Sequence, residues 1–191
     1  MPVSPTIYIS LPVLNEPEHL NDTLECLRNQ NYNNYKLYIC VNQPDDWWQN
    51  PVKKIFCENN RETLNYLGTI KDIPIIIIDK SSPGKGWQGK QGGAGWARKV
   101  IMDEISRQAK DEDIIVSLDA DTIFNPGYFK SLVASFQQNP DIAAISVPYY
   151  HLLTGNETVD RALLRYEIYL RCYAINMLRI NSLYAFTALG S

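Results

Sequence analysis

Short apolar runs alternate with amphipathic segments along this chain, and no other feature of the sequence restricts the fold as much. Runs rich in branched aliphatic residues predict strands, here at residues 6–13, 36–42, 75–79, 114–118 and 142–147. Apolar residues spaced three or four positions apart predict helices, which open at residues 15–17, 50–51, 95, 125–126 and 158. This alternation predicts a three-layer α/β/α sandwich with a mostly parallel central sheet. The four isoleucines at 75–78 predict a strand buried on both faces.

The size, charge and cysteine spacing of the chain argue against several classes of protein. The chain has 191 residues, which suits a single domain, and its formal net charge of −3 gives no basic footprint for nucleic acid. No apolar run approaches the ~20 residues that cross a bilayer, and residues 1–5 do not open a secretory signal. The four cysteines lie too far apart for a CxxC site. We expect buried, reduced thiols in a cytoplasmic protein. A longer parent protein could still be associated with a membrane.

Polar residues gather where the predicted parallel strands stop. An open α/β sheet binds its ligand outside the carboxyl ends of its strands. Packing of such a sheet needs neither carboxylates, amides nor glycines at those ends, so their presence predicts a binding site there. The segments concerned are residues 12–16, 42–46, 79–93 and 119–121.

Asp119 and Asp121 form the most informative pair in the sequence. They lie one residue apart, directly after an apolar strand, so both carboxylates can turn toward the same opening. Carboxylate oxygens suit Mg²⁺ or Mn²⁺, which are commonly shared with substrate phosphates. Such a metal would neutralise charge on a diphosphate leaving group. The alternative is that these aspartates cap a helix or lie solvated in a loop.

The glycine-rich segment 84–99 permits several interpretations. Residues 84–89 match GxGxxG, and 84–91 nearly match a P-loop, but neither leads at once into the helix that these motifs need. Residues 119–123 nearly match the DxDx(T/V) motif of haloacid-dehalogenase-type phosphatases, although several strand–helix units precede them. We favour flexible glycines leading into a helix whose N-terminus attracts anions. Arg98 and Lys99 would add positive charge there, or could be ordinary exposed helix residues.

Three segments, in this order, resemble the glycosyltransferases of family 2, which have a GT-A fold: residues 11–16 (LPVLNE), 93–99 (GAGWARK) and 115–122 (IVSLDADT). The resemblance implies a Rossmann-like nucleotide-diphospho-sugar transferase. Such an enzyme moves a sugar from a nucleoside-diphosphate donor, of UDP or GDP type, to an acceptor glycan or lipid with inversion. It also implies Mn²⁺ or Mg²⁺ as the cofactor.

The resemblance further implies roles for eight residues. It assigns Asp121 as the direct metal ligand, and Asp119 as a second candidate ligand that lies nearer the donor ribose or sugar. Arg98 matches the basic residue near the ribose and phosphate. Asn42 stands where many members have an acidic residue that contacts the base or ribose, which leaves the identity of the base open. The remaining nucleotide-sugar-binding positions are Pro12, Asn15, Glu16 and Gly93.

The catalytic base of the family is a carboxylate in a motif beyond a segment like residues 188–191 (ALGS). The resemblance therefore implies a truncated N-terminal portion without its base. We expect one domain over 1–191, with a nucleotide-sugar-binding core at 6–150 and an incomplete acceptor-side region at 151–191. Two other functions stay open: a nucleotidyltransferase or phosphate-ester enzyme that uses the same acids, and a non-catalytic nucleotide-sugar-binding module. Trp47 and Trp48 could stack on a sugar or base, or simply pack within their own insert.

Overall fold

The structure, a computed structural model, describes residues 4–183 and 185 and divides into two compact units. The first unit is Met1–Asn139 and the second is Pro140–Ser191. The predicted division into a core at 6–150 and a further region at 151–191 stays a prediction.

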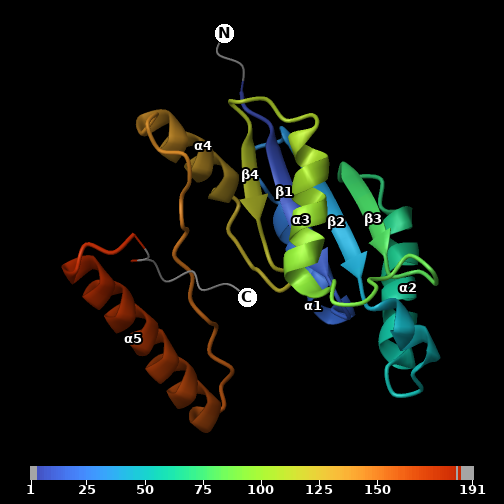
Figure 1. The fold of residues 1–191 in the computed structure, drawn as a ribbon. Coiled ribbons are helices and arrows are strands. Elements are labelled where there is room, and N and C mark those ends of the chain that lie inside the picture. Colours follow the sequence, from blue (N-terminus) through green and yellow to red (C-terminus); the bar gives the residue numbers. More distant parts are fainter. Residues whose placement is uncertain (1–3, 184, 186–191) are drawn as a thin grey trace. The chain divides into compact units, whose positions relative to one another are not determined.

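A four-stranded parallel sheet organises the first unit (Figure 1). Its order is β3-β2-β1-β4, and β1 pairs in parallel with both β2 and β4. The strands are β1 (Ile7–Val13), β2 (Tyr35–Asn42), β3 (Ile75–Lys80) and β4 (Ile114–Ser117). The helices of this unit are α1 (Pro17–Arg28), the short 3₁₀ helix η1 (Asp45–Gln49), α2 (Lys54–Thr69), α3 (Gly93–Ser106) and α4 (Tyr128–Gln138).

Helices cover both faces of this sheet, which confirms the predicted α/β/α sandwich. One hydrophobic cluster joins alternate residues of β1, such as Ile9 and Leu11, to α1, α2 and α4. The second cluster joins Tyr8 and Tyr38 on the other face to α3. Figure 1 shows α3 in front of the sheet and α1 behind it. All seven residues of β1 are buried, because this strand has a neighbour on each side and helices on each face.

The predicted burial of the isoleucine run on both faces is wrong. β3 is an edge strand in the described sheet, and the side chain of Ile77 is 37% exposed. The other edge strand, β4, likewise leaves Ile115 44% exposed. Aliphatic composition alone therefore did not separate a central strand from an edge strand.

Two helix starts lie three or more residues beyond the predicted Asn-Pro caps. Asn50 Oδ1 accepts a hydrogen bond from the amide of Val52 (3.0 Å), and Asn125 Oδ1 accepts one from the amide of Gly127 (2.9 Å). Each asparagine thus closes a local turn on its own backbone, an alternative to helix capping that Asn commonly adopts. A turn precedes α2 and α4 as a result.

The second unit contains one long helix, α5 (Glu157–Arg179), and no strand among its described residues. The predicted strand at 142–147 is therefore wrong: that segment is largely exposed and pairs with no strand in the described residues. Asn156 caps α5, since its side chain accepts hydrogen bonds from Thr158 and Val159. None of the helices in the described part of the chain is long and apolar enough to cross a membrane.

Two carboxylates of α5 bind the segment that precedes this helix in the chain. The amide of Thr154 donates to Asp160 Oδ1 (2.7 Å), and this bond lowers the pKa of Asp160. Hydrogen bonds from Arg171 and then His151 lower the pKa of Glu167 to about 2. Both carboxylates therefore stay ionised above mildly acidic pH and hold the segment on the helix.

Only two of the four cysteines are buried. All four thiols are free; Cys40 and Cys57 are buried, Cys26 is half-buried, and Cys172 is exposed on α5. The prediction of buried thiols is therefore wrong for Cys172, because the helix face that carries it is exposed within the second unit.

Gly86 provides a test of how the loop after β3 is packed. A Cβ at Gly86 would lie 2.7 Å from the Cα of Asp45 and 2.9 Å from the carbonyl oxygen of Gln43, both backbone atoms that cannot move aside cheaply. We expect Gly86→Ala to lower the free energy of unfolding by about 1–3 kcal/mol. Gly68 in α2 has open space around it, so Gly68→Ala should raise that free energy by about 0.5–1 kcal/mol. Urea unfolding of both variants checks this, and equal stabilities would contradict the packing.

Candidate functional site

The carboxyl ends of the parallel strands meet at one edge of the first unit. The arrowheads in Figure 1 point to this edge. Pro12 lies in the buried end of β1, opposite Cys40 of β2, and Asn42 is the last residue of β2. The amide of Leu118 donates to the carbonyl of Ser10 (3.0 Å), so the pairing of β4 with β1 continues up to Asp119. This topology brings the predicted site segments to the same edge.

Three carboxylates share this edge. Asp119 is half-buried, Asp121 is exposed, and Glu16 directly precedes α1. Burial raises the pKa of Glu16, and the negative charges of Asp121 and then Asp119 raise it further. His19 opposes these two charges and lowers the pKa. Since Asp121 and Asp119 both act on Glu16, the three acids lie near one another at this edge.

The acids suit a cation only if a ligand supplies further oxygens. Within the described residues, no three His, Cys, Asp or Glu side chains converge to hold a metal ion. Mg²⁺ is commonly bound by one or two carboxylates together with substrate phosphates. Asp119 and Asp121 fit that incomplete kind of site, and the metal prediction stays a prediction.

Arg98 reaches this edge from the helix layer that α3 forms on one face of the sheet. It lies in α3, and its guanidinium forms an ion pair with the carboxylate of Asp119. Its side chain is 18% exposed, whereas that of Asp119 is 47% exposed. An arginine at this position brings positive charge to the same edge as the acids, and its planar donors suit phosphate groups as well as carboxylates.

The turn that carries the two aspartates is fixed by its neighbours. The amide of Thr122 donates to the carbonyl of Asp119 (3.1 Å), and the amide of Asp119 donates to Thr122 Oγ1 (3.2 Å). The buried hydroxyl of Thr23 on α1 donates to the carbonyl of Ala120 (2.7 Å). Thr23 could not be identified from the sequence, because a single threonine within a helix carries no signal of such a contact.

Asn42 is committed to contacts within the protein. It is 1% exposed; its Nδ2 donates to the carbonyl of Val13 (2.9 Å), and its Oδ1 accepts from Trp87 Nε1 (3.0 Å). These two bonds join the ends of β1 and β2 to the loop after β3. The predicted contact of Asn42 with a nucleotide stays a prediction, and the structure adds a packing role that the sequence analysis did not anticipate.

Asn15 adopts a backbone conformation that non-glycine residues rarely use. Its φ is +55°, in the left-handed region. Asn60 of α2 holds it there, because the amide of Asn15 donates to Asn60 Oδ1 (2.8 Å) while Asn60 Nδ2 donates to Gln43 Oε1 (2.8 Å). Asn59 adds a bond to Asn15 Oδ1 (2.7 Å). The sequence analysis missed Asn60, which is fully buried between the two loops.

Hydrogen bonds hold the first half of the glycine-rich segment. Asp45 Oδ1 accepts hydrogen bonds from the amides of Gly84 (2.8 Å) and Gly86 (3.2 Å), which ties this half to η1. The second half enters α3 through Gly92 (φ +151°) and Gly93 (φ +78°), conformations that favour glycine. The N-cap residue Gly92 has no side chain that could cap this helix, and Gly93 is exposed.

The two tryptophans of η1 both have partners in the protein. Trp48 Nε1 donates to the carbonyl of Ser81 (2.9 Å). The ring of Trp47 packs against Phe56, with ring centroids 5.7 Å apart, and Lys53 Nζ lies 5.0 Å from its centroid. These contacts correspond to the packing interpretation of the pair.

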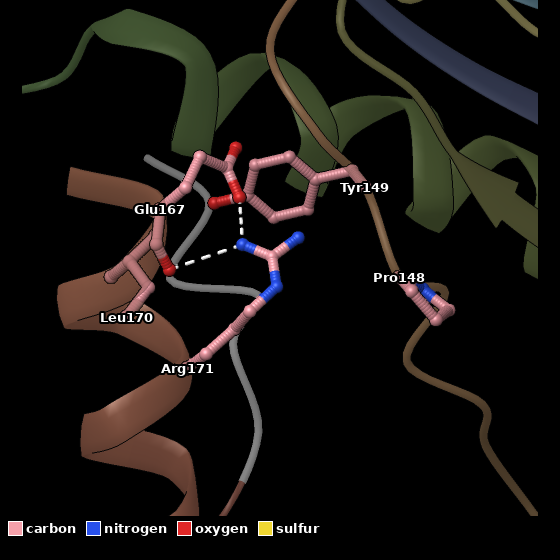
Figure 2. A pocket seen from close by; sticks show the side chains of 5 residues that line it. All are labelled: Pro148, Tyr149, Glu167, Leu170 and Arg171. Atoms are coloured by element: carbon pink, nitrogen blue, oxygen red, sulfur yellow. Dashed lines mark hydrogen bonds and ion pairs between the residues drawn. The ribbon is translucent and has the colours of Figure 1, made fainter. Parts of the chain in front are cut away.

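A pocket of the second unit contains none of the predicted site residues. Figure 2 shows its lining, with the guanidinium of Arg171 directed to Glu167 and the ring of Tyr149 beside them. The charges of Glu167 and Arg171 are thus paired with each other. The remaining lining residues are Pro148 and Leu170.

Asn60 and Asn59 form a matched pair for testing the buried amide network. Asn60→Ala should lower the free energy of unfolding by about 2–3 kcal/mol, because the amide of Asn15 and the buried side chain of Gln43 would lose their partner. Asn59 is half-buried and makes one side-chain bond to Asn15, so Asn59→Ala should cost about 1 kcal/mol or less. Denaturant unfolding measures both, and similar losses would show that Asn60 has no special role.

Comparison with known proteins identifies the family of the chain. The sequence model of the family described as "Glycosyltransferase like family 2" matches residues 5–187. A comparison with curated protein sequences gives no match. Among solved structures, the chain is similar to three crystal structures of S. aureus TarS 1-349.

The structure of TarS 1-349 without a named ligand is 14% identical, with a TM-score of 0.48. The complex with UDP-GlcNAc is 13% identical (TM-score 0.49), and the complex with UDP is 15% identical (TM-score 0.47). Each likeness covers 75% of this chain and 37% or 38% of TarS 1-349, so the chain spans less than two fifths of these structures. Because the family model matches nearly all of its residues, this chain belongs to the glycosyltransferase like family 2.

Proposed function

We propose that this chain is the donor-binding portion of a glycosyltransferase that transfers a sugar, with inversion, from a UDP- or GDP-type donor to an acceptor glycan or lipid. The observation that carries the proposal is the meeting of Asp119, Asp121, Glu16 and Arg98 at the carboxyl edge of the sheet. Acids alone at this edge could have several uses. Acids together with an arginine and the glycine-rich start of a helix suit a diphosphate bound with a cation.

Under this proposal, each residue of the site has its own role in binding the donor and the metal. Asp121 is the exposed carboxylate that would hold Mn²⁺ or Mg²⁺, with Asp119 as the second candidate. The metal, when bound, would neutralise charge that develops on the departing diphosphate. Arg98 lies beside Asp119 and would contact the phosphate or ribose. The exposed amides at the start of α3, from Gly93 onward, can bind a further phosphate oxygen.

The base and ribose of the nucleotide would lie beside the ends of β1 and β2. Pro12 lies at the buried end of β1, Asn15 and Glu16 follow that strand, and Asn42 is the last residue of β2. The rigid turn at Asn15 would give this wall a defined shape. A defined wall favours discrimination between a pyrimidine and a purine, which is why both nucleotide types belong in the test.

Calorimetric titration with UDP, GDP and their sugars, each with Mn²⁺ or with EDTA, tests the donor site. We expect at least one nucleotide to bind more tightly with Mn²⁺, and Asp121→Ala to remove most of that gain because it deletes the proposed metal ligand. Asp111→Ala is the matched control, since Asp111 is an exposed acid outside the site. Absence of binding by every nucleotide, or a metal effect that survives Asp121→Ala, would contradict the proposal.

Arg98 and Lys99 are adjacent cations that the proposal treats differently. Arg98→Gln should weaken nucleotide binding about 10- to 100-fold, because a charge-assisted contact to phosphate contributes about 1.5–3 kcal/mol. Lys99 is exposed and forms an ion pair with Asp103 within α3, so Lys99→Gln should leave the affinity nearly unchanged. The same calorimetric titration measures both. Equal losses from the two substitutions would indicate a general charge effect and would argue against a specific contact of Arg98.

A further inference from the structure

Thr23 makes a contact that its position in a helix does not require. It lies in α1 and is fully buried. Its hydroxyl donates to the carbonyl of Ala120 at 2.7 Å and lies 3.3 Å from the carbonyl of Thr122. A buried threonine in a helix commonly bonds to the carbonyl one turn earlier in its own helix. Thr23 instead reaches across about a hundred residues of sequence to another element.

The two carbonyl groups stand immediately before and after Asp121. The turn also closes on itself, through the bonds between Asp119 and Thr122, but those bonds do not fix it to the rest of the protein. The contact with Thr23 does so, because α1 packs in the main hydrophobic cluster through Leu20, Leu24 and Leu27. The backbone on both sides of Asp121 is thereby held against a rigid helix.

The attachment also joins two elements that carry like charges. Glu16 directly precedes α1, and the charges of Asp121 and Asp119 act on it. Repulsion between these carboxylates favours separation of the start of α1 from the turn. The hydrogen bond from Thr23 joins the same two elements and opposes that separation. It therefore keeps the acids close together before any cation is bound.

We propose that Thr23 is a positioning residue of the metal site, whose hydroxyl fixes the 119–122 turn so that Asp121 faces the cation. The inference rests on the proposed donor site and concerns how that site is assembled. It gives Thr23 no contact with nucleotide or metal. Its loss should therefore weaken the metal-dependent part of nucleotide binding and leave the metal-independent part unchanged.

Substitutions that separate the hydroxyl from the shape of the side chain test this role. Thr23→Val keeps the branched shape without the hydroxyl, Thr23→Ala is a second hydroxyl-free variant, and Thr23→Ser keeps the hydroxyl. In titrations with Mn²⁺ and the nucleotide that the unaltered chain binds best, we expect affinity to fall about tenfold for Val and Ala. Thr23→Ser should bind within about twofold of the unaltered chain. With EDTA all four should bind alike.

Thr63→Val is the matched control for loss of a buried hydroxyl. Thr63 is buried in α2, and its hydroxyl donates to the carbonyl of Asn59 within the same helix (2.9 Å). Its variant should keep the Mn²⁺-dependent affinity. Thermal unfolding of every variant sets a common temperature at which all are folded.

Two outcomes would overturn the inference alone: unchanged Mn²⁺-dependent affinity in both hydroxyl-free variants, or a loss in Thr23→Ser as large as in Thr23→Val. Absence of any Mn²⁺-dependent binding in the unaltered chain would instead overturn the proposed function, and the role of Thr23 in it. The two failures are therefore distinguishable, because the unaltered chain is measured first.

Discussion

Burial of β1 is the constraint on which the rest of the first unit depends. A strand with hydrogen-bonded neighbours and with helices on each face has little access to water, so its backbone groups must be paired within the protein. β2 pairs with β1 over Ile7–Val13 and β4 over Ile7–Ser10, and parallel neighbours place every carboxyl end at one edge. The chain first regains access to solvent at Leu14, directly before Asn15 and Glu16. The candidate site begins there for that reason.

The same burial explains why polar side chains support the site. Where the strands end, backbone groups leave the ladder and need other partners, since an unpaired buried polar group is costly. Asn60 supplies a partner for the amide of Asn15, Asn42 for the carbonyl of Val13, and Thr23 for the aspartate turn. Each bond links segments far apart in sequence. Substitution of any of these residues should therefore affect the shape of the site as well as stability.

The supporting residues show which features of the fold and the site could be predicted from the sequence and which could not. The strands and the two aspartates were predictable, because branched aliphatic runs and acids at a strand end leave local signals. The pairing of Arg98 with Asp119 and the bond from Thr23 to Ala120 were not, because they depend on tertiary packing between distant elements. The prediction of a strand at 142–147 is wrong for a related reason. An apolar segment becomes a strand only when it pairs with another strand, and the described residues offer it none.

The carboxylates at the edge of the sheet act on one another. Burial raises the pKa of Glu16, the negative charges of Asp121 and then Asp119 raise it further, and His19 opposes them. Asp119 also forms an ion pair with Arg98. A divalent cation would offset the repulsion between the acids, and a diphosphate can supply the oxygen ligands that such a cation still needs. Under the proposed function, each of the two ligands therefore makes the binding of the other more favourable, which is reciprocal coupling between metal and nucleotide.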